Sequence, residues 1–255
     1  QPEQYMFQQA GYRAWERLHK AGKLNPVQER FWQEKPEEEL YDLDADPDEV
    51  NNLAASPDCA ALLQRMRGAL RKHQLRIRDN GFIPEGSPLE GFTASRDEAA
   101  YPLERILNWV DIVTKRDPAN VAEFAKNMAD ANEVIRYWAV LGCVMIREKA
   151  AAAKEALLAA VKDNSPRVRV VAAEALCRIG QSTTGLVALS DLVTMHKDPK
   201  VRLQAANALD HLGVMAKPAI AALKKAAGDE DDYVKRAAGY TAAVLAGEAA
   251  PVEGD

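Results

Sequence analysis

An internal repeat in the second half of the chain constrains the fold more than any other feature. A basic residue recurs every 33 residues, and alanine and aliphatic positions recur in the same register. The repeated residues are Arg136, Arg169, Arg202 and Lys235; Ala139, Ala172, Ala205 and Ala238; and Ile146, Ile179, Leu212 and Leu245. A short unit of this kind buries its apolar face only against its neighbours, so the repeat predicts a stacked array.

Each copy has the pattern of a helix pair. One helix is predicted by an apolar stripe at helical spacing, which in the second copy comprises Val168, Val171, Ala172, Ala175, Leu176 and Ile179. Second helices are predicted at about 121–128, 151–161, 186–195 and 218–227. Residues 103–114 lie one step earlier in register, with Leu103 in place of the basic residue, and are predicted to form a capping helix. The pattern therefore predicts an α-solenoid.

These copies resemble short bacterial HEAT-like repeats. In HEAT repeats, an aspartate six residues before the basic residue pairs with the arginine of an adjacent copy. The resemblance implies a ladder made of Asp130, Arg136, Asp163, Arg169, Arg202, Asp229 and Lys235. His196 replaces the aspartate of the third copy, and we expect Asp198 to substitute as the carboxylate for Arg202. Two interpretations of His196 stay open, a pH switch and a half-exposed loop histidine.

The first half of the chain has a different pattern. Residues 39–43 have the apolar spacing of a short strand, Asp46-Pro47-Asp48 is typical of a turn, and residues 49–54 are expected to begin a helix. A longer helix is predicted over 60–77. Its basic face is made of Arg65, Arg67, Arg71, Lys72, Arg76 and Arg78. This face either pairs with the acidic run at 34–49 or contacts a sulfated polyanion.

Several short sequence segments of this half, and their order, resemble the C-terminal subdomain of the sulfatase family. The resemblance is to the bacterial branch similar to N-sulfoglucosamine sulfohydrolase. The segments include Ala21-Gly22-Lys23-Leu24-Asn25, Glu39-Leu40-Tyr41-Asp42-Leu43 and Ile77-Arg78-Asp79-Asn80-Gly81. The residues that carry the central motif are Glu39, Leu40, Tyr41, Asp42, Asp46, Pro47, Glu49, Asn52 and Leu53. The resemblance implies a small antiparallel sheet with one helix, which closes the α/β enzyme.

The family's catalytic machinery is absent from this sequence. Sulfatases use a formylglycine made within a Cys/Ser-x-Pro-x-Arg motif and a calcium ion, and the nearest segment, 143–147, has methionine in place of proline. No catalytic residue is therefore expected in this chain, and both cofactors are expected in a missing N-terminal catalytic domain. Arg78 and Asp79 are the substrate-facing candidates, with docking at the domain seam as the alternative. The resemblance also implies a periplasmic or secreted location.

Composition excludes several classes of function. A net charge of −5 gives no case for nucleic-acid binding, and no apolar run is long enough for a membrane span. The sequence shows no zinc-type spacing of histidine and cysteine, so no metal site is expected. The three cysteines, Cys59, Cys143 and Cys177, are expected to be small buried apolar side chains.

Together these observations predict a mainly α protein. We expect a small α+β sulfatase C-terminal subdomain at 1–85, a linker at 86–100, a HEAT-like α-solenoid at 101–248 and a tail at 249–255. The expected function is that of a C-terminal sulfatase fragment that completes the catalytic fold and offers a surface to a protein or sulfated glycan. A non-catalytic binding scaffold with a remnant subdomain is the alternative. A repeat enzyme of the lyase type, suggested only by similarity of the repeats to bilin lyases, is a third.

Overall fold

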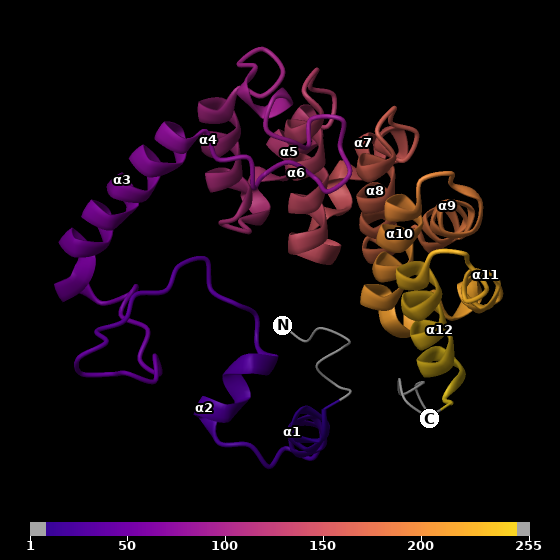
Figure 1. Ribbon diagram of the computed structural model, residues 1–255, viewed down its shortest axis with the longest axis horizontal. Coiled ribbons are helices and arrows are strands. Elements are labelled where there is room, and N and C mark those ends of the chain that lie inside the picture. Colours follow the sequence, from indigo (N-terminus) through magenta and orange to yellow (C-terminus); the bar gives the residue numbers. More distant parts are fainter. Residues whose placement is uncertain (1–8, 249–255) are drawn as a thin grey trace. The chain divides into compact units, whose positions relative to one another are not determined.

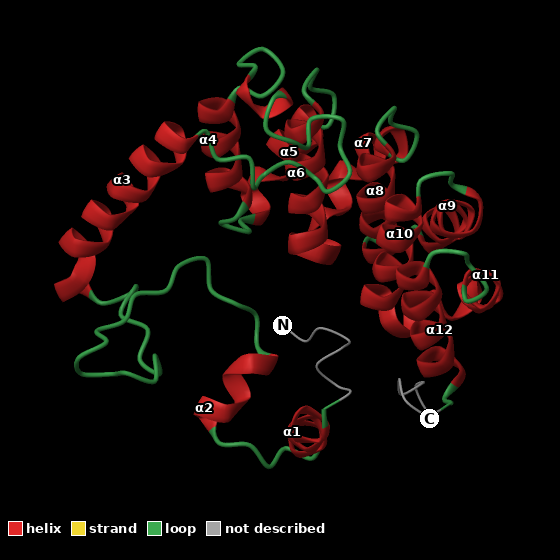
Figure 2. Ribbon diagram, viewed as in Figure 1, coloured by secondary structure: helices red, strands yellow, loops and turns green. Residues whose placement is uncertain are grey.

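The computed structural model describes residues 9–248, and their regular structure is entirely helical (Figure 2). The chain divides into two compact units at the boundary between Gln74 and Leu75. The prediction of a mainly α protein is therefore confirmed. The tail at 249–255 lies outside the described residues.

The first unit begins with a short helical hairpin. Helix α1 (Ala10–Lys20) ends before Gly22, whose positive φ of 63° allows the chain to turn. Helix α2 (Pro26–Glu29) starts with Pro at its first position and a reciprocal capping box between Asn25 and Gln28. It continues as the 3-10 helix η2 (Arg30–Trp32). The hairpin packs through aromatic rings, with Trp15 stacked on Phe31 at a centroid distance of 4.7 Å.

The strand predicted at 39–43 is absent from the described part of the chain, and so is the helix expected to begin at 49–54. A strand needs a partner along its length, and here Leu40 and Leu53 share a single backbone hydrogen bond of 2.7 Å. The Asn52 side chain replaces a partner strand, because its Oδ1 accepts from the Leu40 N–H at 2.9 Å and its amide donates to the Glu38 carbonyl at 3.0 Å. The segment is therefore a loop held by side chains.

Helix α3 (Ala60–Ile77) follows the 3-10 turn η3 (Pro57–Cys59) and has the bounds that the sequence predicted. It runs across the boundary between the two units. Arg78 ends it with a φ of 50°. The guanidinium of Arg96 donates to the Arg78 carbonyl at 2.8 Å and to the Ile77 carbonyl at 3.3 Å, which satisfies acceptors at the end of the helix.

The second unit is built from two rows of helices (Figure 1). One row contains α4 (Leu103–Val113), α6 (Glu133–Ile146), α8 (Pro166–Arg178), α10 (Pro199–Leu212) and α12 (Asp232–Ala246). The other contains α5 (Val121–Asn127), α7 (Lys154–Ala160), α9 (Ser182–Met195) and α11 (Ile220–Ala226). Short 3-10 segments complete the connections: η4 (Ala94–Arg96), η5 (Pro118–Asn120), η6 (Arg147–Ala153) and η7 (Gly213–Ala219).

Successive helices of the first row pack on each other, and each of α5, α7, α9 and α11 packs on the first-row helix that follows it. The repeated alanines Ala139, Ala172, Ala205 and Ala238 are all fully buried, so the helices approach closely at one position of every copy. Val168 and Leu176 of the predicted stripe are also fully buried. The solenoid prediction is confirmed.

The segment at 86–100, expected to be a linker, belongs to the second unit instead. Leu89 of this segment, and Phe82 and Ile83 just before it, pack against the apolar core to which α4 and α6 contribute. The Trp138 indole donates to the Phe82 carbonyl at 2.9 Å, and Asn132 donates to the Ala100 carbonyl at 2.8 Å. Apolar side chains among the Gly and Pro residues explain why this segment packs.

A glycine in α9 tests the close packing of the two rows. A Cβ at Gly185 would lie 2.4 Å from the Ala173 carbonyl oxygen and 2.5 Å from Cys177 Sγ. We expect Gly185→Ala to lower the free energy of unfolding by about 1–3 kcal/mol, because backbone must move. Gly239→Ala in α12, where a Cβ meets only Ala227 at 3.7 Å, is the control and should raise stability by about 0.5–1 kcal/mol. Urea unfolding measures both, and an unchanged midpoint for Gly185→Ala would contradict the close packing.

Candidate functional site

An arginine ladder joins the copies of the solenoid. Arg136 Nε and Nη2 donate to the two carboxylate oxygens of Asp163 at 2.7 and 3.0 Å. Two copies further along, Arg202 makes the same bidentate contact with Asp229 at 2.8 and 2.8 Å. Each arginine therefore binds the carboxylate that belongs to the next copy.

The same arginines also hold the loop that precedes their own helix. Arg136 Nη1 donates to the carbonyls of Asp130 at 2.9 Å and Ala131 at 3.0 Å. Arg202 Nη1 likewise donates to the carbonyls of His196 and Lys197. The guanidinium thus joins three segments: its own helix, the loop before it and the loop of the next copy.

The ladder aspartates organise the helix starts. Asp163 Oδ1 accepts from the Ser165 N–H at 2.7 Å, and Asp229 Oδ1 accepts from the Asp231 N–H at 2.9 Å. Ser165 and Asp231 are in turn the N-caps of α8 and α12. Hydrogen bonding by Arg202 and then by backbone N–H groups holds the pKa of Asp229 below its ordinary value. The carboxylate therefore stays ionised and serves both the ladder and the turn.

The first rung differs from the sequence expectation. Leu103 stands at the repeat position, yet Arg105, two residues later, pairs with Asp130. The long Arg105 side chain reaches the same carboxylate from a position two residues later, which the strict spacing of 33 residues does not reveal. At the other end, Lys235 contacts Asp232 of its own helix at 3.7 Å.

His196 breaks the ladder at the third copy. Its Nδ1 accepts from the Asp198 N–H at 3.1 Å, so it performs the turn-forming role of the aspartates. Arg169, whose rung would end here, donates to the main-chain carbonyls of Asp163 and Asn164. Asp198 accepts from Arg167 at 2.6 Å, so our expectation that it would serve Arg202 is wrong. Burial, followed by the positive charge of Arg169, lowers the pKa of His196 despite the hydrogen bond with Asp198.

The substrate-facing candidates lie where α3 joins the solenoid unit. Arg78 Nη1 pairs with Glu98 at 2.9 Å, while its Nε and Nη2 are buried without a hydrogen-bond partner. Asp79 Oδ1 accepts from the Gly81 N–H at 3.0 Å, and its carbonyl accepts from the Tyr101 hydroxyl at 2.9 Å. Asp79 thus shapes a turn, while Arg78 keeps unused donors.

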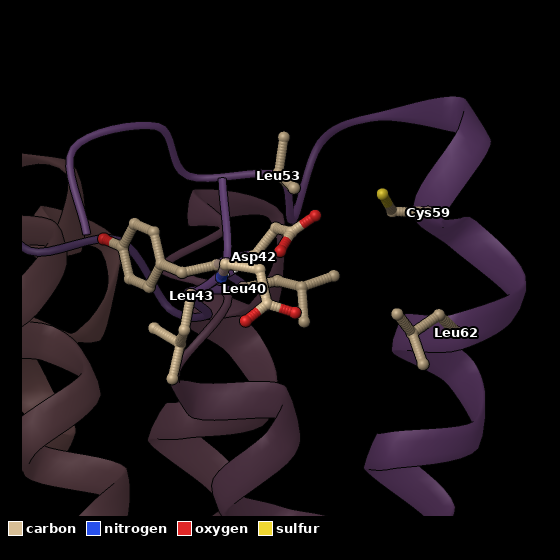
Figure 3. Close-up of a pocket in the computed structure, with 8 residues that line it drawn as sticks. Leu40, Asp42, Leu43, Leu53, Cys59 and Leu62 are labelled. Atoms are coloured by element: carbon tan, nitrogen blue, oxygen red, sulfur yellow. Dashed lines mark hydrogen bonds between the residues drawn. The ribbon is translucent and has the colours of Figure 1, made fainter. Parts of the chain in front are cut away.

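The sulfatase-like motif residues lie together in the first unit. Asp46 accepts from the Asn51 N–H at 2.6 Å, and Leu40 is buried with 7% of its surface exposed. Beside them is a pocket of about 330 Å³ (Figure 3). Its lining comprises Leu40, Tyr41, Asp42, Leu43, Asp44, Leu53, Cys59 and Leu62. Sequence reasoning identified the motif but not Cys59 and Leu62, which reach the pocket from η3 and α3.

Within residues 9–248, the structure contains no group of three or more histidine, cysteine or acidic side chains placed to hold a metal ion. Cys143 lies fully buried in α6, and burial raises the pKa of its thiol to about 12. Cys59 is half-buried, unlike the buried position expected for it. None of the described helices is long and apolar enough to cross a membrane.

Replacing His196 by aspartate should restore the missing rung. We expect His196→Asp to raise the free energy of unfolding by about 1 kcal/mol, because the new carboxylate pairs with Arg169 and still accepts from the Asp198 N–H. Urea unfolding at pH 7.5 measures it. The matched control is the same change with Arg169→Gln, in which the gain should vanish. A gain that survives in the control would show that the rung is not its source.

The lowered pKa of His196 predicts a pH dependence. Because the unfolded chain binds the proton more readily, stability should fall as pH drops below about 6.5, the ordinary histidine value, toward the lower folded pKa. His196→Asn, whose side-chain oxygen also accepts from an N–H, should remove this part of the dependence. The check is the difference in urea midpoint between pH 7.5 and pH 5.0. Equal differences in the native chain and the variant would contradict the assignment.

Comparisons with known proteins found two similarities. Residues 155–243 match the family model for HEAT repeats. A stretch of 70 residues is 40% identical to part of a protein named ulvan-active sulfatase from Formosa agariphila. That stretch covers 27% of this chain and 12% of the sulfatase, so the chain matches a small part of that protein's length. The solenoid is thus similar to HEAT repeats, and a shorter portion of the chain is similar to a sulfatase.

Proposed function

We propose that this chain is the C-terminal part of a sulfatase-like protein. Its first unit completes the catalytic fold, and its solenoid presents an interaction surface to a protein or a sulfated glycan. The whole protein hydrolyses a sulfate ester or sulfamate, with formylglycine and calcium held by residues outside this sequence. The 40% identity to part of a sulfatase supports the class of reaction, and HEAT repeats support the role in interaction.

The observation that carries this proposal is an uncovered apolar stripe on α3. Leu62, Met66 and Leu70 follow one another at helical spacing, and 39%, 50% and 58% of their surfaces are exposed. Only Leu63 of this helix is buried. A helix that forms part of a finished core covers such a stripe, so the stripe is typical of a surface awaiting another domain.

The pocket continues this stripe. Leu62 lines it from α3, and Leu43, with 61% of its surface exposed, lines it from the motif loop (Figure 3). An apolar side chain from a docked domain would fill the space between these leucines and gain about 2 kcal/mol from burial. The motif loop, which is held by Asn52 and Asp46, thus contributes directly to the proposed docking surface.

The scaffold alternative predicts that this apolar surface is covered. A remnant subdomain in a self-sufficient scaffold would cover its apolar side chains within the chain itself. Leu40 is covered in this way, whereas Leu43 and the α3 stripe are not. The exposed stripe favours the sulfatase proposal over the scaffold.

Sequencing the coding DNA upstream of Gln1 is the direct test. The expected result is an in-frame α/β domain with a Cys/Ser-x-Pro-x-Arg motif. The protein expressed from the whole frame should release sulfate from a sulfated glycan, and replacing the motif Cys/Ser by alanine should abolish that release. A start codon immediately before Gln1 would refute the proposal.

Surface substitutions test the docking role of the stripe. Met66→Gln with Leu70→Gln should leave the stability of the present chain within about 0.5 kcal/mol, because both side chains are exposed here. Leu63→Ala, a buried position on the same helix, should cost about 2–3 kcal/mol. In the protein expressed from the whole frame, the double variant should lower the melting temperature of the catalytic domain. Equal melting temperatures there would contradict docking on this stripe.

A further inference from the structure

Residues 82–90 form a strap that lies on the edge of the solenoid. The strap is organised by its own hydrogen bonds: the Ser87 N–H donates to the Pro84 carbonyl at 3.0 Å, and the Glu90 N–H donates to the Ser87 carbonyl at 2.9 Å. The Glu90 carboxylate accepts from the Gly86 N–H at 2.7 Å. These contacts form two consecutive turns that leave the Glu85 carbonyl for the solenoid to bind.

The solenoid binds that carbonyl with side chains from two copies. Arg167 of α8, only 6% exposed, donates from Nε to the Glu85 carbonyl at 3.2 Å. Gln204 of α10 donates from Nε2 to the same oxygen at 3.1 Å. Asp198 holds the other side of the Arg167 guanidinium at 2.6 Å, which fixes its orientation. A buried arginine that binds a main-chain oxygen is an arrangement that recognises peptide backbone.

The charges of this edge distinguish the copies beneath the strap from the others. Arg167 and Lys200 occupy equivalent repeat positions, and the corresponding residues of the flanking copies are Val134 and Tyr233. Lys200 Nζ lies 3.7 Å from the Glu85 carboxylate and 3.4 Å from that of Glu90. The basic residues therefore occur where the acidic strap lies.

Two further contacts restrict which residues can bind at this edge of the solenoid. A Cβ at Gly86 would lie 2.3 Å from Arg167 Nη2, and its φ of 75° favours glycine. The buried Ser87 hydroxyl donates to Glu133 at 2.9 Å, and the other oxygen of Glu133 accepts from the Ser165 hydroxyl at 2.6 Å. The edge thus selects an acidic residue, a glycine and a small hydroxyl residue in succession.

We propose that the edge formed by Glu133, Arg167, Lys200 and Gln204 is a binding site for acidic peptides that turn at a Glu-Gly-Ser core, occupied in cis by the strap. The recognised groups are a main-chain carbonyl, two carboxylates and one hydroxyl, so any chain with this turn and charge is a ligand. The strap is then an internal competitor that keeps the site closed until it is displaced. This inference stands independently of the sulfatase proposal.

A peptide-binding experiment on the full chain tests the site. Gly86→Val should expel the strap, because a β-branched residue is strained at a φ of 75° and its Cβ would also displace the Arg167 guanidinium from its contacts. A fluorescent peptide with the sequence of residues 81–92 should then bind the variant at one site and bind the native chain at least tenfold more weakly, as measured by fluorescence anisotropy. Adding Lys200→Glu to the variant should weaken binding roughly tenfold. A peptide with both glutamates changed to lysine is the matched control and should not bind.

A second variant keeps the proposal falsifiable if Gly86→Val does not fold. Glu85→Lys with Glu90→Lys places like charges against Lys200 without adding volume at Gly86. It should also release the strap and admit the fluorescent peptide. A folded variant of either kind that binds no peptide, or a native chain that binds it equally well, would overturn the proposal and leave the strap as structural packing.

Discussion

The bidentate pairing of an arginine in one copy with an aspartate in the next is the interaction on which the solenoid depends. Alanines line the contacts between successive helices, and such small side chains allow close approach without dictating register. Arg136 and Asp163 fix the register, since a planar guanidinium donates to both oxygens of a carboxylate in only one orientation. Their side chains are only 15% and 10% exposed, so solvent screens the pair weakly.

The ladder also explains why the strap lies where it does. Asp229 completes the rung of Arg202, but the copy before it has His196, and Asp198 is left to hold Arg167. Arg167 is thereby oriented toward the Glu85 carbonyl. A departure from the repeat is thus accompanied by a new contact, and the site lies at the irregular copy. The regular copies form the scaffold, and the irregular copy provides the contact with the strap.

The first unit illustrates the opposite situation, in which an element lacks its partners. Its motif loop is held by Asn52 and Asp46 through backbone hydrogen bonds, although no strand forms there. The exposed α3 stripe and the pocket beside Leu43 are apolar surfaces without cover. Similarity to part of a sulfatase and this uncovered surface lead to the same proposal by independent routes.

The sequence by itself determined the solenoid, because the 33-residue period reflects the contact that each copy makes with the next. It also determined the helix at 60–77, because helical spacing of apolar residues is a local pattern. Only the tertiary structure decided the rest. The strand at 39–43 was predicted from local spacing, but a strand exists only with a partner. Arg105 replaced Leu103 in the first rung because side-chain reach, rather than spacing, selects the partner of Asp130. Residues 86–100 were predicted to be a linker and Glu85 to belong to the subdomain before it. Glu85 contacts Arg167 and Gln204, which lie 82 and 119 positions later in the sequence, and no local pattern encodes contacts over such separations.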